Sequence, residues 1–250
     1  MILTIILDYK DNSFTFHDIL VEFHGLIFDL LFLGIILTIY ETFRDKKDKI
    51  ERYKDEIDDL REWQSKEAKF KIIGRIKRLY NLGVTNFNLN GCYLKKGDLM
   101  EYNFTKSTFA FANLESARFT RSNLSECDFV AAKLIKTQFV DSMAYKTNFE
   151  HSDLSNSTII SSDFSYSNLQ KANLNGSIII GTDFNSANMS NANLKNIRVY
   201  DLNWFDNLKL NNVNGIEKLI EKYQICPESL ETDEIGQSWI VTKKPTHNNS

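Results

Sequence analysis

The chain has 250 residues, and its 30 basic and 33 acidic side chains give a formal net charge of −3. This near balance argues against a strongly charged partner such as a nucleic acid. Three cysteines are too few for a disulfide framework and indicate reduced thiols, and an apolar content of 42% is normal for a soluble protein.

A long apolar segment lies near the N-terminus. The residues from Ile19 to Tyr40 are dominated by Leu, Ile and Phe, and as a helix they can cross a hydrocarbon layer of about 30 Å. We therefore expect residues 1–43 to form a short tail and a transmembrane helix. The alternative is a buried helix of a soluble protein, because acidic residues and a histidine interrupt the segment and are unfavourable in lipid.

Three residues of this segment would share one side of the helix. Glu22, Gly25 and Asp29 are separated by 3 and 4 positions, and ionisable groups on one stripe usually face another helix or water. We therefore predict self-association of the spans through this stripe. Alternatively, Glu22 and His24 lie among the lipid headgroups and Asp29 begins a shorter or tilted insertion.

The charges on either side of the segment predict its orientation. Residues 1–18 contain one Lys and no small-residue cleavage site follows, which disfavours a cleaved signal peptide. Six basic residues follow the segment closely: Arg44, Lys46, Lys47, Lys49, Arg52 and Lys54. Basic residues mark the cytoplasmic side, so we expect a single-pass protein of the cell inner membrane with a cytoplasmic C-terminal domain.

Residues 44–83 are expected to form a charged helical linker and an N-terminal cap. Apolar residues at spacings of 3, 4 and 3 over residues 50–60 predict a helix with a short coiled-coil-like seam. The sequence KFKIIGRIKRLYNLG then predicts a basic amphipathic helix that ends at Gly83. This helix either lies on anionic lipid or covers the open end of the domain that follows, and we favour the second.

Residues 84–205 repeat with a period of five. Every fifth residue from Leu89 to Leu194 is large and apolar, with Ala144 as the one exception among 22. Two positions earlier stands Ala, Ser, Thr, Cys or Gly in 20 of 21 units, with Tyr102 as the exception. A period of five fits neither a helix face nor a strand face. It predicts a short strand and a two-residue corner in each unit, so that the chain coils into a solenoid.

Asn or Asp often precedes the large residue, and units such as ANLES, ANLNG and ANLKN fit the pattern A-[DN]-L-x-x. The segment therefore resembles the pentapeptide-repeat family. That resemblance implies a mainly β fold, a right-handed quadrilateral parallel β-helix in which each coil contains four of the five-residue units. Every twentieth residue from Leu94 to Leu194 is Leu, which favours a coil of four units over a coil of three. The segment would make about six coils.

Residues 206–250 are expected to form a C-terminal capping helix and a tail. Ile216, Leu219, Ile220 and Tyr223 would share one face of a helix over residues 215–225. The last residues are polar and predict a disordered end.

No catalytic, cofactor-binding or metal-binding residues are predicted, and we do not expect an enzyme. P-loop, dinucleotide-binding and nucleophile-elbow motifs are absent from the sequence. The histidines show no metal-ligand spacing. They stand at His17, His24, His151 and His247.

Nucleic-acid mimicry is the least favoured function. Some members of the resembled family are acidic rods that mimic duplex DNA and inhibit type II topoisomerases. Residues 84–204 contain 11 basic and 11 acidic residues, so their net charge is zero. A mimic of a polyanion needs a strong negative field and a nucleic-acid binder a positive one. No nucleic-acid partner is expected.

One side of the predicted rod carries an apolar strip. Most residues directly after the large one are polar, but Val140, Ile160 and Ile180 would stack in one column, with Ile178 beside them. Exposed contiguous apolar surface usually marks an interface. Alternatively, the chain's own helices or its C-terminal tail cover the strip, or a bulge near Ala144 breaks the column.

These features predict a membrane-tethered cytoplasmic scaffold that presents a rigid rod to a protein partner or to another copy of itself, as a homo-oligomer. The alternative is a membrane-active effector whose spans assemble into a bundle or pore. The resemblance alone names no partner.

Overall fold

The computed structural model describes residues 16–233 and 236–245. The chain divides into two compact units, residues 1–52 and 53–250. The first unit consists of a helix in its described part, and the second contains the repeats and their caps. The predicted N-terminal tail before residue 16 and the polar end after residue 245 lie outside the described residues.

The helix α2 (Phe16–Asp58) contains the predicted apolar segment. From Phe23 onward it is long and apolar enough to cross a membrane, and none of its most apolar stretch is buried by the residues that the structure describes. The helix continues without a break through the basic residues that follow this stretch. The predicted transmembrane helix and the first part of the charged linker therefore belong to one helix.

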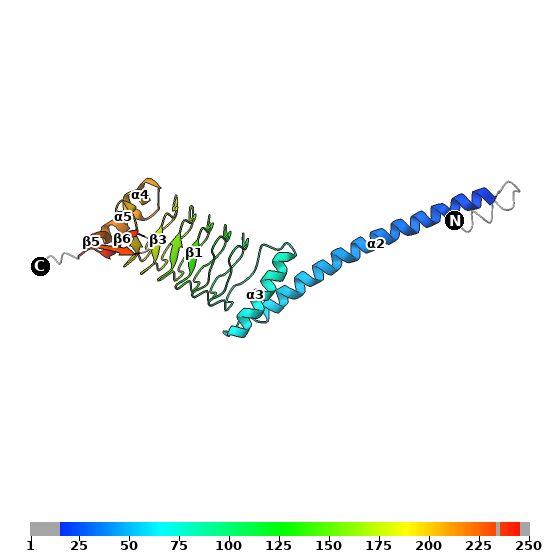
Figure 1. Ribbon diagram of the computed structural model, residues 1–250, viewed down its shortest axis with the longest axis horizontal. Helices are drawn as coiled ribbons and strands as arrows, with labels where there is room; N and C mark the ends of the chain where they lie inside the picture. The colour runs from blue at the N-terminus through cyan, green and yellow to red at the C-terminus, as the bar shows by residue number, and fades with distance from the viewer. Residues whose placement is uncertain (1–15, 234–235, 246–250) are drawn as a thin grey trace. The chain divides into compact units, whose positions relative to one another are not determined.

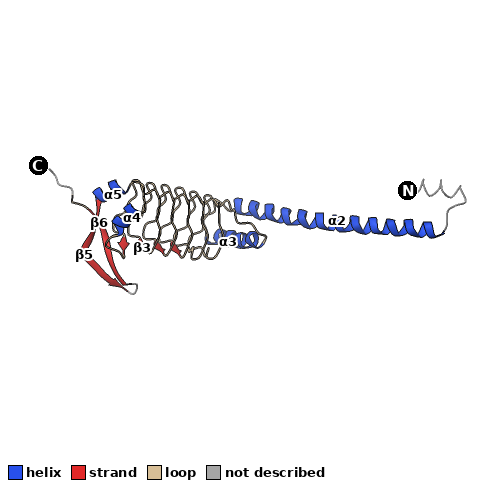
Figure 2. Cartoon of the chain, turned by 90° about the horizontal axis from the view of Figure 1, so that it is seen from above, coloured by secondary structure: helices blue, strands red, loops and turns tan. Residues whose placement is uncertain are grey.

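The repeats form the predicted coil of four units. Parallel β-bridges join the residue before the large one to its equivalent four units later, from Asn88 with Thr108 to Asn173 with Asn193. On one side of the rod these bridges lengthen into four short parallel strands, paired in register (Figures 1 and 2). They are β1 (Gln138–Val140), β2 (Thr158–Ile160), β3 (Ile178–Ile180) and β4 (Arg198–Val199). The predicted quadrilateral parallel β-helix is confirmed.

The large residue of each unit fills the axis of the rod. All of them between Leu89 and Leu194 are at most 3% exposed. The rings of Phe109, Phe129 and Phe149 stack in one column, with centroids 4.6 and 5.2 Å apart. Such stacks add aromatic contact to the burial of apolar area, which is the main stabilising term.

The register runs unbroken through the weakest repeat. Ala144 is fully buried on the axis, and its neighbour Met143 makes parallel bridges to Asn123 and to Asp163. The bulge considered near Ala144 is therefore wrong.

The small residue of each unit often donates a hydrogen bond as well as saving space. Thr137 Oγ1 donates to the carbonyl of Leu114 (3.0 Å), and Ser122 Oγ donates to that of Leu99 (2.7 Å). Both bonds join one coil to the coil before it. The exception, Tyr102, makes an edge contact with Tyr80 of the N-terminal cap, with ring centroids 5.0 Å apart.

The corners require a left-handed backbone. The second residue after the large one has positive φ in unit after unit, and most of these residues are not glycine, for example Phe111 (60°), His151 (59°) and Lys171 (58°). The Asn or Asp before the large residue supports the turn, as where Asn113 Oδ1 accepts the N–H of Glu115 (3.2 Å).

The helix α3 (Lys66–Asn81) caps the N-terminal end of the rod. Its apolar residues Ala68, Ile72, Ile76 and Leu79 are buried. Because this face packs inside the chain, the interpretation of α3 as a helix whose apolar face lies on lipid is wrong. The predicted cap is confirmed, and the helix ends before Gly83, whose φ is 87°.

The predicted seam also packs within the chain. Ile57 is 3% exposed, and the guanidinium groups of Arg75 and Arg78 lie 5.7 and 5.8 Å from the centre of the Tyr53 ring. Glu56 forms an ion pair with Arg75. The last turns of α2 are therefore part of the cap.

The C-terminal end is closed by two helices and a hairpin. The predicted capping helix is α5 (Ile216–Lys222), preceded by α4 (Trp204–Leu210). The helix α5 is shorter than expected, because Tyr223, which was predicted on its face, begins a strand instead. The sequence pattern did not predict the strands β5 (Tyr223–Asp233) and β6 (Gly236–Lys243) that follow. β6 pairs antiparallel with β4, which gives the sheet order β1-β2-β3-β4-β6-β5. The hairpin thus covers the last open strand edge on this side of the rod.

Replacing His151 by Val should lower the free energy of unfolding by about 1–2 kcal/mol, because a β-branched residue is strained at positive φ. His151→Asn is the matched control, since Asn tolerates this conformation. Chemical denaturation of the full chain measures both. Equal stability of the two variants would contradict the role assigned to the corners.

Candidate interaction surface

The four predicted residues of the apolar strip come together on the sheet. Val140 is paired with Ile160, and Ile160 with Ile180, in the outward column after the axial residues. Ile178 lies outward on the other side of the buried Ile179. All four residues are half-buried. We call these four residues the strip.

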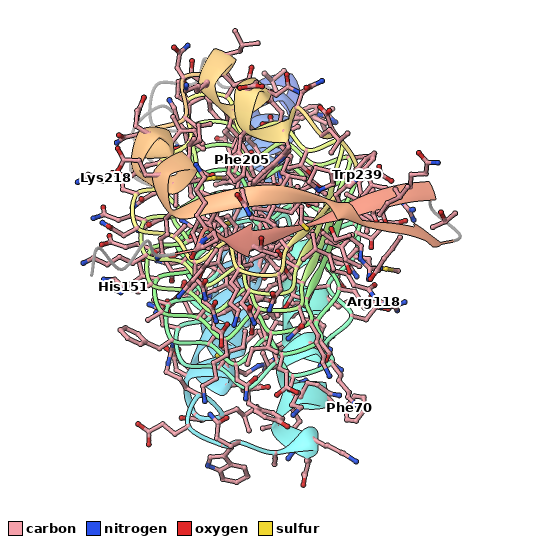
Figure 3. The ribbon with its side chains drawn as sticks, turned by 90° about the vertical axis from the view of Figure 1, so that its left-hand side faces the viewer. Phe70, Arg118, His151, Phe205, Lys218 and Trp239 are labelled. Atoms are coloured by element: carbon pink, nitrogen blue, oxygen red, sulfur yellow. The ribbon has the colours of Figure 1, made fainter. Side chains whose placement is uncertain are left out.

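The hairpin lengthens the sheet at its C-terminal edge. Ile240 pairs with Arg198 and Trp239 pairs with Val199, so β6 lies beside β4 in the same sheet. Figure 3 shows the hairpin reaching sideways beyond the side of the rod that carries Arg118. The strip is therefore bounded at its C-terminal end by a projecting hairpin.

The N-terminal half of the same side is charged instead of apolar. Arg118 forms an ion pair with Asp98 (2.8 Å) one coil earlier, and Arg121 forms one with Glu101. Charges of opposite sign thus alternate from one coil to the next along the rod. This side changes from paired charges to aliphatic residues at about its midpoint.

Sequence reasoning missed exposed apolar and aromatic residues on the next side of the rod from the strip. Met143 is 48% exposed and Tyr166 is 52% exposed, and the rings of Tyr145 and Tyr166 meet edge to face at 5.5 Å. Tyr and Met are enriched in protein interfaces. The available signal was that Met143, like Ile178, places an aliphatic side chain where most repeats have a polar one.

Both ends of the rod are mixed in charge, but one capping segment at each end has a clear excess of one sign. α3 has six basic residues and one acidic residue. β5 has three acidic residues and no basic one. Glu231 of β5 is exposed and pairs with Arg198 (2.5 Å).

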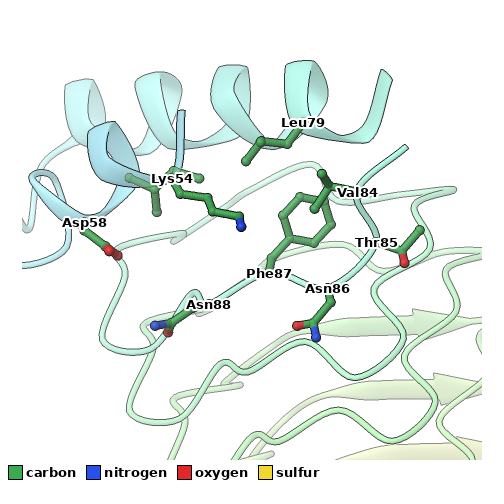
Figure 4. A pocket seen from close by; sticks show the side chains of 9 residues that line it. Lys54, Asp58, Leu79, Val84, Thr85, Asn86, Phe87 and Asn88 are labelled. Carbon is green, nitrogen blue, oxygen red and sulfur yellow. The ribbon is translucent and has the colours of Figure 1, made fainter. Parts of the chain in front are cut away.

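A cavity of about 550 Å³ lies beneath the N-terminal cap (Figure 4). Its apolar lining includes Ile57, Leu79 and Phe87, and its polar lining includes Lys54 and Asp58. It has neither a histidine nor a thiol among its lining residues. We assign it to the junction between cap and first coil.

The thiols of the repeats are poor nucleophiles. Burial raises the pKa of Cys92 to about 11 and that of Cys127 to about 12. The Cys127 thiol also donates to the carbonyl of Phe104 (2.9 Å). Cys226 is half-buried in the hairpin. Over residues 16–233 and 236–245, no group of three acidic, His or Cys side chains is placed to hold a metal.

The predicted association stripe lies on α2. The helix is continuous through Glu22, Gly25 and Asp29, so their spacing keeps them on one side of it. Gly25 and Asp29 are exposed in the single chain. The association stripe on α2 lies in the first compact unit, and the aliphatic strip on the β-helix lies in the second.

Comparisons with known proteins agree with the repeats. Residues 86–121, 122–159 and 160–196 match the family described as "Pentapeptide repeats (8 copies)". No curated protein matches the chain.

Solved structures of repeat proteins resemble part of the chain. The plasmid-mediated fluoroquinolone resistance protein QnrB1 is 21% identical over 43% of this chain and 57% of its own, with a TM-score of 0.31. A protein of the Arabidopsis thaliana thylakoid lumen is 21% identical over 51% and 79%, with a TM-score of 0.29. A protein of the cyanobacterium Cyanothece 51142 is 23% identical over 40% and 63%, with a TM-score of 0.28. Residues 86–196 are thus a segment of pentapeptide repeats.

Proposed function

We propose that this chain is a membrane-anchored interaction rod. α2 holds it in the cell inner membrane as a single-pass protein, and the β-helix stands on the cytoplasmic side, where it binds a protein partner or another copy of itself. The observation that carries this proposal is the strip, an aliphatic patch on a rod whose other outward columns are mostly polar. Both ends of the rod are capped, so its sides are the surfaces left for binding.

The membrane part of the proposal rests on composition and charge. Nothing in the described part of the chain covers the apolar stretch of α2, and burying this stretch in lipid removes its side chains from water. Basic residues follow it and favour the cytoplasm for the C-terminal side.

A second candidate function is a membrane-active effector whose spans form a bundle or pore. The stripe of Glu22, Gly25 and Asp29 favours it, because ionisable groups within a span usually face another helix or water. A topoisomerase inhibitor that mimics DNA is less favoured, since the repeats have no net charge.

The anchor is tested by extraction and labelling in cells. The full chain should stay with the membrane in alkaline carbonate and keep its complete mass. On intact cells, an impermeant thiol reagent should label a Cys placed at Asn12 and leave one placed at Gln170 unlabelled. Release by carbonate would contradict the anchor, loss of the N-terminal segment would indicate a cleaved leader, and reversed labelling would contradict the cytoplasmic assignment.

The strip is tested by Ile160→Lys combined with Ile180→Lys. Two charges in the strip should abolish the chain's cross-linked complexes in membranes, because an apolar contact does not accommodate unpaired ammonium groups. Both changes point outward and leave the axis packed, so we expect only a small loss of unfolding free energy. Each kcal/mol lost would lower the melting temperature by about 2–4 °C. Glu150→Lys with Gln170→Lys, at the same place in their units on the opposite side, is the control. Unchanged complexes in the strip variant would exclude the strip as the binding surface.

The effector function is tested by Asp29→Leu. If the spans associate through the stripe, this change should reduce cross-linked oligomers and membrane conductance, because it removes a polar contact between helices. Thr38→Leu, elsewhere on the same helix, serves as the control. Oligomers that persist unchanged in Asp29→Leu would contradict association through the stripe.

A further inference from the structure

Three features of the rod follow one another along its length. The basic helix α3 caps one end, the strip lies past the middle, and the acidic strand β5 closes the other end. Figure 1 shows α3 and the hairpin at opposite ends of the repeats. A partner that matches this surface must offer an acidic region, an apolar region and a basic region in the opposite order.

A second copy of the same chain, turned end over end, offers that order. We propose that the strip is covered by another copy of this chain, packed side against side and antiparallel, about a two-fold axis near Ile160. The inference rests on the proposed role of the strip as a contact surface and names its occupant. Two-fold contacts are the commonest in homo-oligomers and place the same patch of both chains in contact.

The axis near Ile160 follows from the spacing of the coils. Ile160 lies one coil from Val140 on one side and one coil from Ile180 on the other. Rotation about it sets Val140 opposite the partner's Ile180, and Ile160 opposite its own equivalent. Sheets packed face to face lie about 10 Å apart, which suits aliphatic side chains.

Charge and shape both favour the antiparallel orientation. The strand β5, with three acidic residues and no basic one, then lies toward the partner's end that carries α3, with six basic residues, whereas parallel rods would bring the two α3 helices together and the two β5 strands together. The hairpins also project sideways at one end of the rod (Figure 3). In parallel rods the two hairpins would meet at one level, while in antiparallel rods each reaches over the first coils of the partner.

The contact is small, and the membrane strengthens it. The three coils of the strip's main column span only about 10 Å at a strand spacing near 4.8 Å. Small interfaces give weak association in solution. Two chains held in one membrane meet at a high effective concentration.

Thiol cross-linking of the full chain in membranes tests the contact. The background is Cys226→Ser, because Cys226 is the half-buried thiol, while Cys92 and Cys127 are buried. Ile160→Cys should form covalent dimers with a short bismaleimide. So should Thr158→Cys, which leaves all four strip residues in place. Gln170→Cys, half-buried at the matching place on the opposite side, should not.

The orientation is tested with two differently tagged chains. Val140→Cys and Ile180→Cys should cross-link to each other in a mixture and not each to itself. A carbodiimide, which joins carboxylates directly to lysines, should also link β5 to α3. These segments lie at opposite ends of one rod, so such a link must join two chains.

Three outcomes would overturn the proposal. Self-linking of Val140→Cys as strong as in the mixture would indicate parallel rods. A β5 to α3 link without an Ile160→Cys dimer would indicate end-to-end stacking. Cross-linking of Ile160→Cys to a different protein would leave the strip a contact surface and exclude a second copy as its occupant. Release of the chain from the membrane by carbonate would contradict the membrane anchor and not the contact between the rods.

Discussion

The rod depends on the packing of one large apolar side chain from every unit of five on a common axis. Each of these side chains must meet those of the coils above and below, which fixes the coil at four units and sets the register between successive coils. Two of the remaining four positions of each unit are also constrained. The residue two before the axial one must be small, because the walls of the coil converge there, and the residue two after it is held at positive φ. The chain therefore expresses its individual chemistry mainly at the two positions that flank the axial residue.

Those flanking positions explain why the strip and the ion pairs stand out. In most coils they hold Asn, Asp, Ser or Lys, whose side chains bond to the turn or to a neighbouring coil. Asn168, for example, donates to Asn148 (3.1 Å) and accepts from Asn188 (3.2 Å). Val140, Ile160, Ile178 and Ile180 make no such bonds. Because these four side chains do not support the turn through hydrogen bonds, a surface role is the simpler account of them.

Much of this arrangement was predictable because the repeat is a local rule written many times. The period of five gave the coil length, the identity of the buried residues and the column of the strip, and α3 and α5 followed from their helical spacing. The positive φ of Lys171 or Phe111 was not predictable, because closure of the coil imposes it on residues that do not prefer it. The aromatic cluster at Tyr145 and Tyr166 needed the distances between coils.

The hairpin escaped prediction for a different reason. β5 contains Pro227 and three acidic residues, and it shows no clean alternation of apolar and polar residues. Its partner β6 forms a strand because β4 offers an open edge, as the hydrogen bonds of Val241 with Asn196 (2.7 Å) and Ile197 (2.9 Å) show. Strand formation here depends on a tertiary context that lies about 40 residues earlier in the chain.

In the membrane-bound protein, we expect the side of the rod that carries the strip to be a contact surface. A structure of the full chain in a lipid bilayer would show what covers this side. We expect two rods packed antiparallel, with Ile160 of both chains beside the two-fold axis and each hairpin near the partner's α3. A chain that remains single in the bilayer, with this side of the rod open to water, would contradict this expectation.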